Sequence, residues 1–125
     1  MIGCDVRNMN EATRTILMNK DLIAINQDFE GRQAYTVNDW ISDDLLYYVK
    51  ILSNGDFAIA LVNFGERRAR AHFQFWDLGL PMAAGYGLQL TDLWTKEDLG
   101  VETAFYRTML DPHCCQVLRA KVVKL

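Results

Sequence analysis

The sequence has no apolar run approaching the roughly 20 residues that span a bilayer, and it has no excess of basic charge. Its 13 Lys and Arg residues are outnumbered by 16 Asp and Glu residues, and the two signs are mixed along the chain, giving a formal net charge of -3. A basic face that would attract nucleic acid or anionic lipid is therefore not expected. We expect neither a nucleic-acid partner nor a membrane partner.

Cysteine is scarce and badly placed for pairing. The three cysteines are Cys4 and the adjacent Cys114 and Cys115, and neighbouring cysteines rarely meet disulfide geometry. We therefore expect reduced thiols, which would suit a cytoplasmic location. A zinc site needs four ligands in spaced pairs, and His72 and His113 do not supply that pattern. No metal and no cofactor are predicted.

Signals for export and for nucleotide binding are missing as well. The N-terminus has no basic region followed by an apolar one, so no secretory signal is visible, although this says nothing of the compartment if the chain belongs to a longer protein. The eight glycines are scattered, and none forms a phosphate-cradling loop that opens a helix. Nucleotide binding is therefore disfavoured.

No local cluster of side chains offers a catalytic acid, base or nucleophile. Ser42, His72 and Asp77 can be drawn as a triad, but His72 falls on the polar face of an amphipathic strand and no strained turn presents the serine. The acidic pairs at 43–44 and 97–98 lie beside turns, where such residues cap and solvate the chain. The predicted list of catalytic residues is empty.

The first 31 residues have the character of a strand followed by helix. Half of the 125 residues are hydrophobic, which supports one folded domain with an appendage, but a complete eight-stranded β/α barrel needs about 250 residues. Residues 1–7 are a short apolar stretch typical of the end of a buried strand. Asn10 can cap a helix, and apolar residues as far as about Gln27 predict helix over about 11–27, either continuous or broken near Asn19.

After Gly31 the pattern changes to β-rich runs separated by turn residues about every ten positions, as in a sandwich or barrel. We place a domain boundary there, with residues 1–31 before it and residues 32–125 after it. Residues 45–52 and 57–64 flank Asn54 and Gly55, which predicts a hairpin because both residues tolerate positive φ. The second of these runs is apolar on both faces, so we expect it to be a central strand.

Residues 68–76 alternate between apolar and polar, which predicts a strand with one solvated face. Further strands are expected at about 33–38, 86–93, 102–110 and 114–123, with breaks at 77–79, 96–100 and 111–112. The fold class is thus mainly β, an antiparallel β-sandwich of seven or eight strands. Seven aromatic residues of the predicted strands and turns have two possible roles. Packing in the core is the more frequent one, and stacking on sugar rings is the alternative. The aromatic residues concerned are Trp40, Tyr47, Tyr48, Trp76, Tyr86, Trp94 and Tyr106.

Two N-terminal motifs, IGCDVRNM at 2–9 and NKDLIAINQD at 19–28, closely resemble the motifs that close the catalytic barrel of family 27 α-galactosidases, or melibiases. Looser similarity continues through 92–94, 98–100 and 112–113, so the resemblance covers essentially the whole chain. Two features depart from the family. Phe29 follows the second motif at a position where the family commonly has a proline, and Cys114 and Cys115 follow the similar residues at 112–113.

The resemblance implies a catalytic β/α barrel followed by an antiparallel β-sandwich. Retaining enzymes of this kind use two carboxylates about 5 Å apart, as nucleophile and as acid/base. In the family both lie on earlier barrel strands, in motifs that this chain does not contain, so neither role can be carried over. Residues 1–7 resemble the eighth barrel strand, whose C-terminal end faces the active site. Ile2, Gly3, Cys4 and Asp5 would then either lie beside the galactose pocket or merely close the barrel.

These observations predict the C-terminal part of an α-galactosidase, with galactosides as substrates of the complete enzyme and this chain inactive alone. The alternatives are an autonomous carbohydrate-binding module and an interaction or oligomerisation domain. The apolar residues of the helical segment would pack between barrel elements in the family. Without the barrel, these apolar residues would have to be buried in another way, either in a homodimer formed through this helix or by packing against the sandwich.

Overall fold

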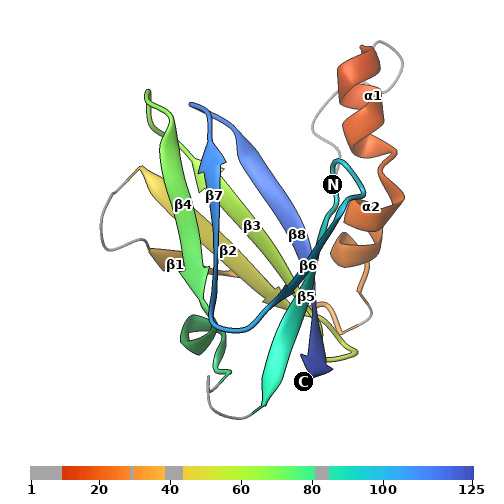
Figure 1. Ribbon diagram of the computed structural model, residues 1–125. Coiled ribbons are helices and arrows are strands. Elements are labelled where there is room, and N and C mark those ends of the chain that lie inside the picture. Colours follow the sequence, from red (N-terminus) through yellow and green to blue (C-terminus); the bar gives the residue numbers. More distant parts are fainter. Residues whose placement is uncertain (1–9, 29, 39–43, 81–84) are drawn as a thin grey trace.

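The computed structural model describes residues 10–28, 30–38, 44–80 and 85–125. Within these ranges two helices, α1 (Glu11–Leu17) and α2 (Lys20–Asn26), precede eight strands and one short 3-10 helix, η1 (Phe75–Leu78) (Figure 1). The strands are β1 (Tyr35–Asn38), β2 (Leu45–Ile51), β3 (Phe57–Asn63), β4 (Ala69–Gln74), β5 (Tyr86–Asp92), β6 (Asp98–Glu102), β7 (Phe105–Leu110) and β8 (Cys115–Lys124).

Each helix begins at an asparagine that satisfies backbone N–H groups lacking a partner in the first turn. The Asn10 side chain accepts a hydrogen bond from the Thr13 amide at 2.8 Å. The Asn19 side chain accepts from the amides of Asp21 and Leu22 at 3.1 and 3.3 Å. The predicted helical segment is therefore broken at Asn19, because this residue caps a second helix.

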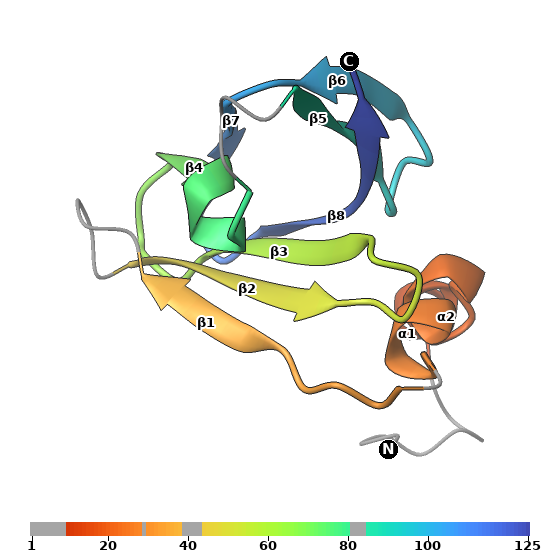
Figure 2. The same cartoon turned by 90° about the horizontal axis from the view of Figure 1, so that it is seen from below.

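The strands form two antiparallel sheets. Six of them are ordered β1-β2-β3-β8-β5-β6, and β4 pairs with β7 in the second sheet. Figure 2 shows the large sheet bending round, with β4 and β7 closing its open side. The mainly β, sandwich-like fold of eight strands in the described ranges is as predicted.

The predicted hairpin is confirmed as β2 and β3, in register from Leu45 opposite Asn63 to Ile51 opposite Phe57. At the turn, the Leu52 amide donates to the Asp56 carbonyl at 2.8 Å, and Gly55 takes the left-handed backbone with φ 86°. A glycine is favoured here because that conformation has no steric penalty without a Cβ atom. β3 lies between β2 and β8, as expected of a central strand.

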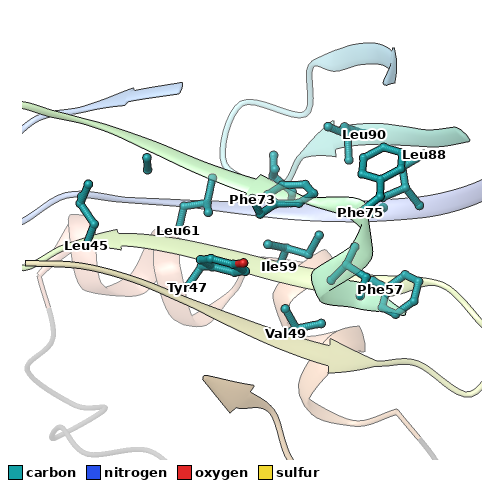
Figure 3. Packing of buried hydrophobic residues seen from close by; sticks show 14 of the residues in the cluster. Leu45, Tyr47, Val49, Phe57, Ile59, Leu61, Phe73, Phe75, Leu88 and Leu90 are labelled. Carbon is teal, nitrogen blue, oxygen red and sulfur yellow. The ribbon is translucent and has the colours of Figure 1, made fainter. Parts of the chain in front are cut away.

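The hydrophobic core fills the space between the two sheets. Ile59, Leu61 and Phe73 have 0–1% of their surface exposed. Figure 3 shows Phe73 of β4 among side chains of the large sheet, and its ring lies 6.2 Å from that of Tyr47 and 5.8 Å from that of Tyr106. Each such residue stabilises the fold by about 1.5–3 kcal/mol through burial.

The strand predicted at about 102–110 is observed as β7, which begins later than expected, at Phe105, and pairs with β4. Glu102 instead ends β6, which pairs with β5 in the other sheet. The predicted break at 96–100 is wrong in part, since β6 begins at Asp98 and includes Gly100. Gly100 has φ 86° beside a register shift at Leu90 and Thr91. It is therefore the irregular point of an edge strand and not a terminator.

The strand predicted at 68–76 is shorter than expected. β4 ends at Gln74, and Phe75 begins η1, which Gly79 closes at φ 78°. The alternation still predicted the buried face correctly, because Ala71, Phe73 and Phe75 are all buried. The domain boundary at Gly31 stays a prediction.

Candidate functional site

The pocket-adjacent residues predicted from the sequence, Ile2, Gly3, Cys4 and Asp5, lie outside the described residues. Ser42 of the triad considered above lies outside them too. Asp77 has a structural role, because its carboxylate accepts hydrogen bonds from the Tyr47 hydroxyl and from the backbone N–H of Gln74 at the start of η1.

Two carboxylates are buried in the described part of the chain, and both are bound by structural donors. Asp92 Oδ1 accepts from the amides of Trp94 and Thr95 at 2.8 and 3.1 Å, and its Oδ2 accepts from Gln116 Nε2 at 2.9 Å. These contacts fix the turn after β5 and join β5 to β8. A carboxylate held by three such donors is positioned to order the chain, not to attack a substrate.

Asp56 is the second buried carboxylate. Its Oδ2 atom lies 3.2 Å from Arg119 Nη2 and 3.1 Å from Asn54 Nδ2, which joins the β2–β3 turn to β8. Asp56 and Asp92 therefore serve separate networks. Neither network has the features of a retaining glycosidase, in which a nucleophile and an acid/base face one substrate.

A polar junction joins the helix pair to two turns of the sandwich. We define it by Asn19, Asp28, Lys50, Ser53 and Lys96. In its first half, Asn19 Nδ2 donates to the Leu93 carbonyl at 3.0 Å and Lys96 Nζ donates to Asn19 Oδ1 at 2.9 Å. Lys96 also pairs with Asp21 on α2. The backbone of Lys96 has φ 63°, a conformation that is uncommon for a residue with a side chain.

In the second half of the junction, the chain after α2 meets the β2–β3 hairpin. Ser53 Oγ donates to Asp28 Oδ1 at 2.7 Å, and the Ser53 amide lies 3.1 Å from Asp28 Oδ2. Lys50 Nζ donates to the Ile25 carbonyl at 2.6 Å, near the end of α2. The hydrogen bond from the Ser53 hydroxyl is the main cause that lowers the pKa of Asp28 below its ordinary value.

Apolar contact at the junction is limited. A shallow apolar hollow of about 140 Å³ remains between α2 and the large sheet, lined by Ile25, Tyr48, Ala60 and Val117 among others. Neither helix has a buried residue, and Ile16 and Met18 are 49% and 61% exposed. The helices therefore touch the sandwich mostly through hydrogen bonds.

Comparison with known families matches residues 42–120 to the alpha galactosidase C-terminal beta sandwich domain. The chain belongs to this family. The match covers more than half of the 125 residues and includes most of the β-strands.

Individual α-galactosidases agree with the family match. The chain is 38% identical over 94 residues to the α-galactosidase of Coffea arabica, covering 75% of this chain and 24% of the relative. It is 31% identical over 118 residues to a probable α-galactosidase of Dictyostelium discoideum, covering 93% of this chain and 30% of the relative. The crystal structure of α-galactosidase I from Mortierella vinacea superposes with a TM-score of 0.81 at 27% identity, covering 95% of this chain and 30% of that protein. The chain thus spans less than a third of the length of these proteins.

These findings confirm the resemblance to the C-terminal part of the family 27 α-galactosidases. The second motif of the sequence has a visible role in the structure, because its first and last residues, Asn19 and Asp28, both belong to the junction. Sequence reasoning missed Lys50, Ser53 and Lys96. Their partners lie 25 to 77 positions away in the chain, so no local pattern could indicate them.

The aromatic residues of the domain divide between core and surface. Tyr47 is 4% exposed and belongs to the core, whereas Trp76, Tyr86 and Trp94 are 67%, 43% and 36% exposed. Tyr86 begins β5 and Trp94 lies eight positions later, beyond its end, a separation of roughly 26 Å in extended chain. These two rings therefore do not share one stacking platform.

Among the described residues no group of three or more His, Cys, Asp or Glu side chains is arranged to hold a metal ion. Neither α1 nor α2 is long and apolar enough to cross a membrane. Cys114 and Cys115 are free thiols. Partial desolvation of the Cys115 thiol raises its pKa, which favours the protonated form.

Proposed function

We propose that this chain is the supporting C-terminal domain of a retaining α-galactosidase and supplies no catalytic residue. The complete enzyme would hydrolyse terminal α-linked galactose. The observation that carries the proposal is the family match over 42–120, together with relatives that are α-galactosidases. The chain covers only 24–30% of those relatives, so the activity belongs to the proposal.

Two structural observations support a supporting role. Both buried carboxylates of the described residues, Asp56 and Asp92, are bound by donors that order turns. The helix pair also presents Ile16, Met18 and Ile23 to solvent, at 49%, 61% and 38% exposure. Apolar side chains gathered on two short helices suit burial against a further protein surface. In the proposed enzyme that surface is the catalytic barrel.

An activity assay tests the catalytic half of the proposal. The purified chain is incubated with a chromogenic α-galactoside, and the Coffea arabica α-galactosidase serves as the positive control. We expect no turnover above the rate in buffer. Hydrolysis that persists through successive purification steps and follows the protein peak would contradict the proposal.

A chimera tests the supporting half. This chain replaces the corresponding C-terminal part of the Mortierella vinacea enzyme, and we expect a folded, active chimera. Truncation of the same enzyme before this part should give an unstable or inactive protein, because barrel surface would be exposed. An active truncated enzyme of unchanged thermal stability would show that the domain gives no support.

Self-association through the helix pair is a second candidate function, favoured by the exposed Ile16, Met18 and Ile23. If this face is covered by a second copy, multi-angle light scattering should give twice the mass of 14.4 kDa. Met18→Lys and Ile23→Lys should then restore the monomer. A monodisperse monomer of the unaltered chain at high concentration would exclude the dimer.

A carbohydrate-binding module is the remaining alternative from the sequence. Calorimetric titration with neutral galactosides separates it from a supporting domain, since only the module predicts saturable heat. The separation of Tyr86, at the start of β5, from Trp94, beyond its end, gives that module little support in the described residues.

A further inference from the structure

The outer face of the β4–β7 sheet carries a hollow that the proposed function does not use. It has a volume of about 370 Å³ and is lined by Arg70, His72, Gln74, Phe105 and Arg107. Strand alternation explains the lining, because the neighbouring positions Ala71 and Phe73 point into the core. Figure 2 shows α1 and α2 well away from the β4–β7 sheet. The hollow is thus separate from the face proposed to meet the barrel.

Two guanidinium groups dominate the charge of this hollow. Arg70 lies opposite Met109 and His72 lies opposite Arg107, so the two arginines are diagonal neighbours across the strand pair. At that spacing the Cβ atoms are about 7–8 Å apart, which lets two long side chains converge on one group. Among the described residues, no carboxylate lines the hollow.

The arginines of this hollow differ from three other arginines of the chain. Arg32, Arg68 and Arg119 each pair with a carboxylate, at 2.7, 3.2 and 3.2 Å. Over the described ranges, neither Arg70 nor Arg107 makes such a pair. The Arg107 guanidinium instead lies 4.6 Å from the centre of the Phe105 ring, a cation–π contact that restricts its position. Among the described residues, one oriented cation with a second beside it is therefore available to an anion.

The remaining groups indicate what kind of anion fits. The Gln74 side-chain amide belongs to the capping box of η1 with Asp77, and its N–H groups can donate hydrogen bonds to hydroxyl oxygens. Phe105 and Met109 add exposed apolar surface, at 44% and 45%. An acidic peptide is the other ligand class that a cluster of arginines can bind, and it is titrated in parallel below. A ring bearing hydroxyls and one oxyanion matches all of these groups.

We propose that the Arg70–Arg107 hollow is a binding site for an acidic saccharide, a sugar unit that carries a carboxylate or a sulfate ester. The two guanidinium groups hold the oxyanion, since their planar forks match carboxylate and sulfate oxygens. Gln74 contacts hydroxyl groups, and the exposed edge beside Phe105 accepts the ring. The site goes beyond support of a barrel, and it requires no catalytic residue.

Calorimetric titration of the whole 125-residue chain tests the site, with oligogalacturonate and galactose 6-sulfate as probes. Neutral galactose oligomers, inorganic sulfate and an acidic peptide are titrated in parallel. We expect saturable binding of at least one acidic saccharide, at least tenfold tighter than any of the three comparison ligands. Equal binding of sulfate or of the peptide would overturn the assignment to a saccharide, as would the absence of saturable binding.

Variants locate the binding on this face. Arg70→Ala and Arg107→Ala should each weaken binding of the acidic saccharide by about tenfold, the loss expected for one charge-assisted contact. Lys121→Ala removes the same charge from an exposed position on β8 and should change the affinity less than twofold. Gln74→Ala should weaken saccharide binding without changing that of sulfate.

Near-ultraviolet circular dichroism tests whether each variant is folded. Arg107→Lys keeps the positive charge but loses the planar guanidinium group, and it replaces an arginine variant that unfolds. Affinity unchanged in the arginine variants would overturn the proposal, and its failure would leave the supporting role untouched.

Discussion

The sandwich and the helix pair are held by different interactions. In the sandwich, both sheets contribute fully buried side chains, including Phe73, Ile59 and Leu118 at 0% exposure. α1 and α2 have seven residues each and no buried residue, and hydrogen bonds link them to the turns. Isolated helices shorter than about 12–15 residues are marginal in water. We therefore expect the sandwich to fold cooperatively and the helix pair to open locally at a lower free energy.

The largest expected effect is in the core of the sandwich. Phe73→Ala should lower the free energy of unfolding by about 3–5 kcal/mol, because it removes a fully buried ring and leaves a cavity. Urea denaturation followed by circular dichroism measures the change. Phe105→Ala is the matched control, since this ring is 44% exposed on the outer face and should cost far less. Equal losses would show that the space between the sheets is not the main source of stability.

A buried amide gives the next effect. Asn63 is 1% exposed, and its Nδ2 donates to the carbonyls of Arg67 and Leu110 at 2.9 and 3.1 Å. Asn63→Ala leaves the buried Leu110 carbonyl without that donor and should cost about 1–3 kcal/mol. Thermal and urea unfolding both report this loss. Asn26→Ala, at an exposed position of α2, should cost much less, and a similar cost in both variants would argue against the network.

A smaller and local effect is expected at the junction. Lys50→Met keeps most of the side-chain length but removes the donor to the Ile25 carbonyl. Hydrogen exchange of α2 amides, such as that of Gln27 bonded to Ile23, should accelerate by roughly two- to tenfold, as for one lost hydrogen bond. Exchange in β3 and β8 should not change. Lys121→Met serves as the control, and uniform acceleration across the chain would show that helices and sandwich open together.

The smallest effect is a dependence of helix attachment on pH. The Ser53 hydroxyl lowers the pKa of Asp28 in the folded state, so this contact stabilises the folded chain above the unfolded pKa of about 3.9. The stabilisation is lost as the pH falls through the folded pKa, and α2 exchange should then increase. Ser53→Ala should raise the pKa of Asp28 toward its ordinary value. Carboxyl-carbon NMR titration measures it, and an identical titration curve in the variant would show that the hydroxyl has no such influence.

The elements predicted well from the sequence are those whose signal is local. Alternation along β4 identified the buried face that contains Ala71 and Phe73, and the Asn54-Gly55 turn located the hairpin. The elements predicted badly depend on distant partners. β6 was missed, because residues 96–100 were predicted as a break and only pairing with β5 identifies the strand. The hollow at Arg70 and Arg107 was likewise not foreseen, since these residues are 37 positions apart and only the register of β4 and β7 brings them together.

The sequence by itself determined the family, the alternation of buried and exposed faces and the absence of a recognisable catalytic motif. These properties follow from residue types at short spacing, where backbone periodicity dictates which side chains share a face. Only the tertiary structure decided that Asp28 meets Ser53 and that Asp56 meets Arg119. Contacts between distant residues depend on how whole sheets pack and bend, and no short stretch of chain contains that information.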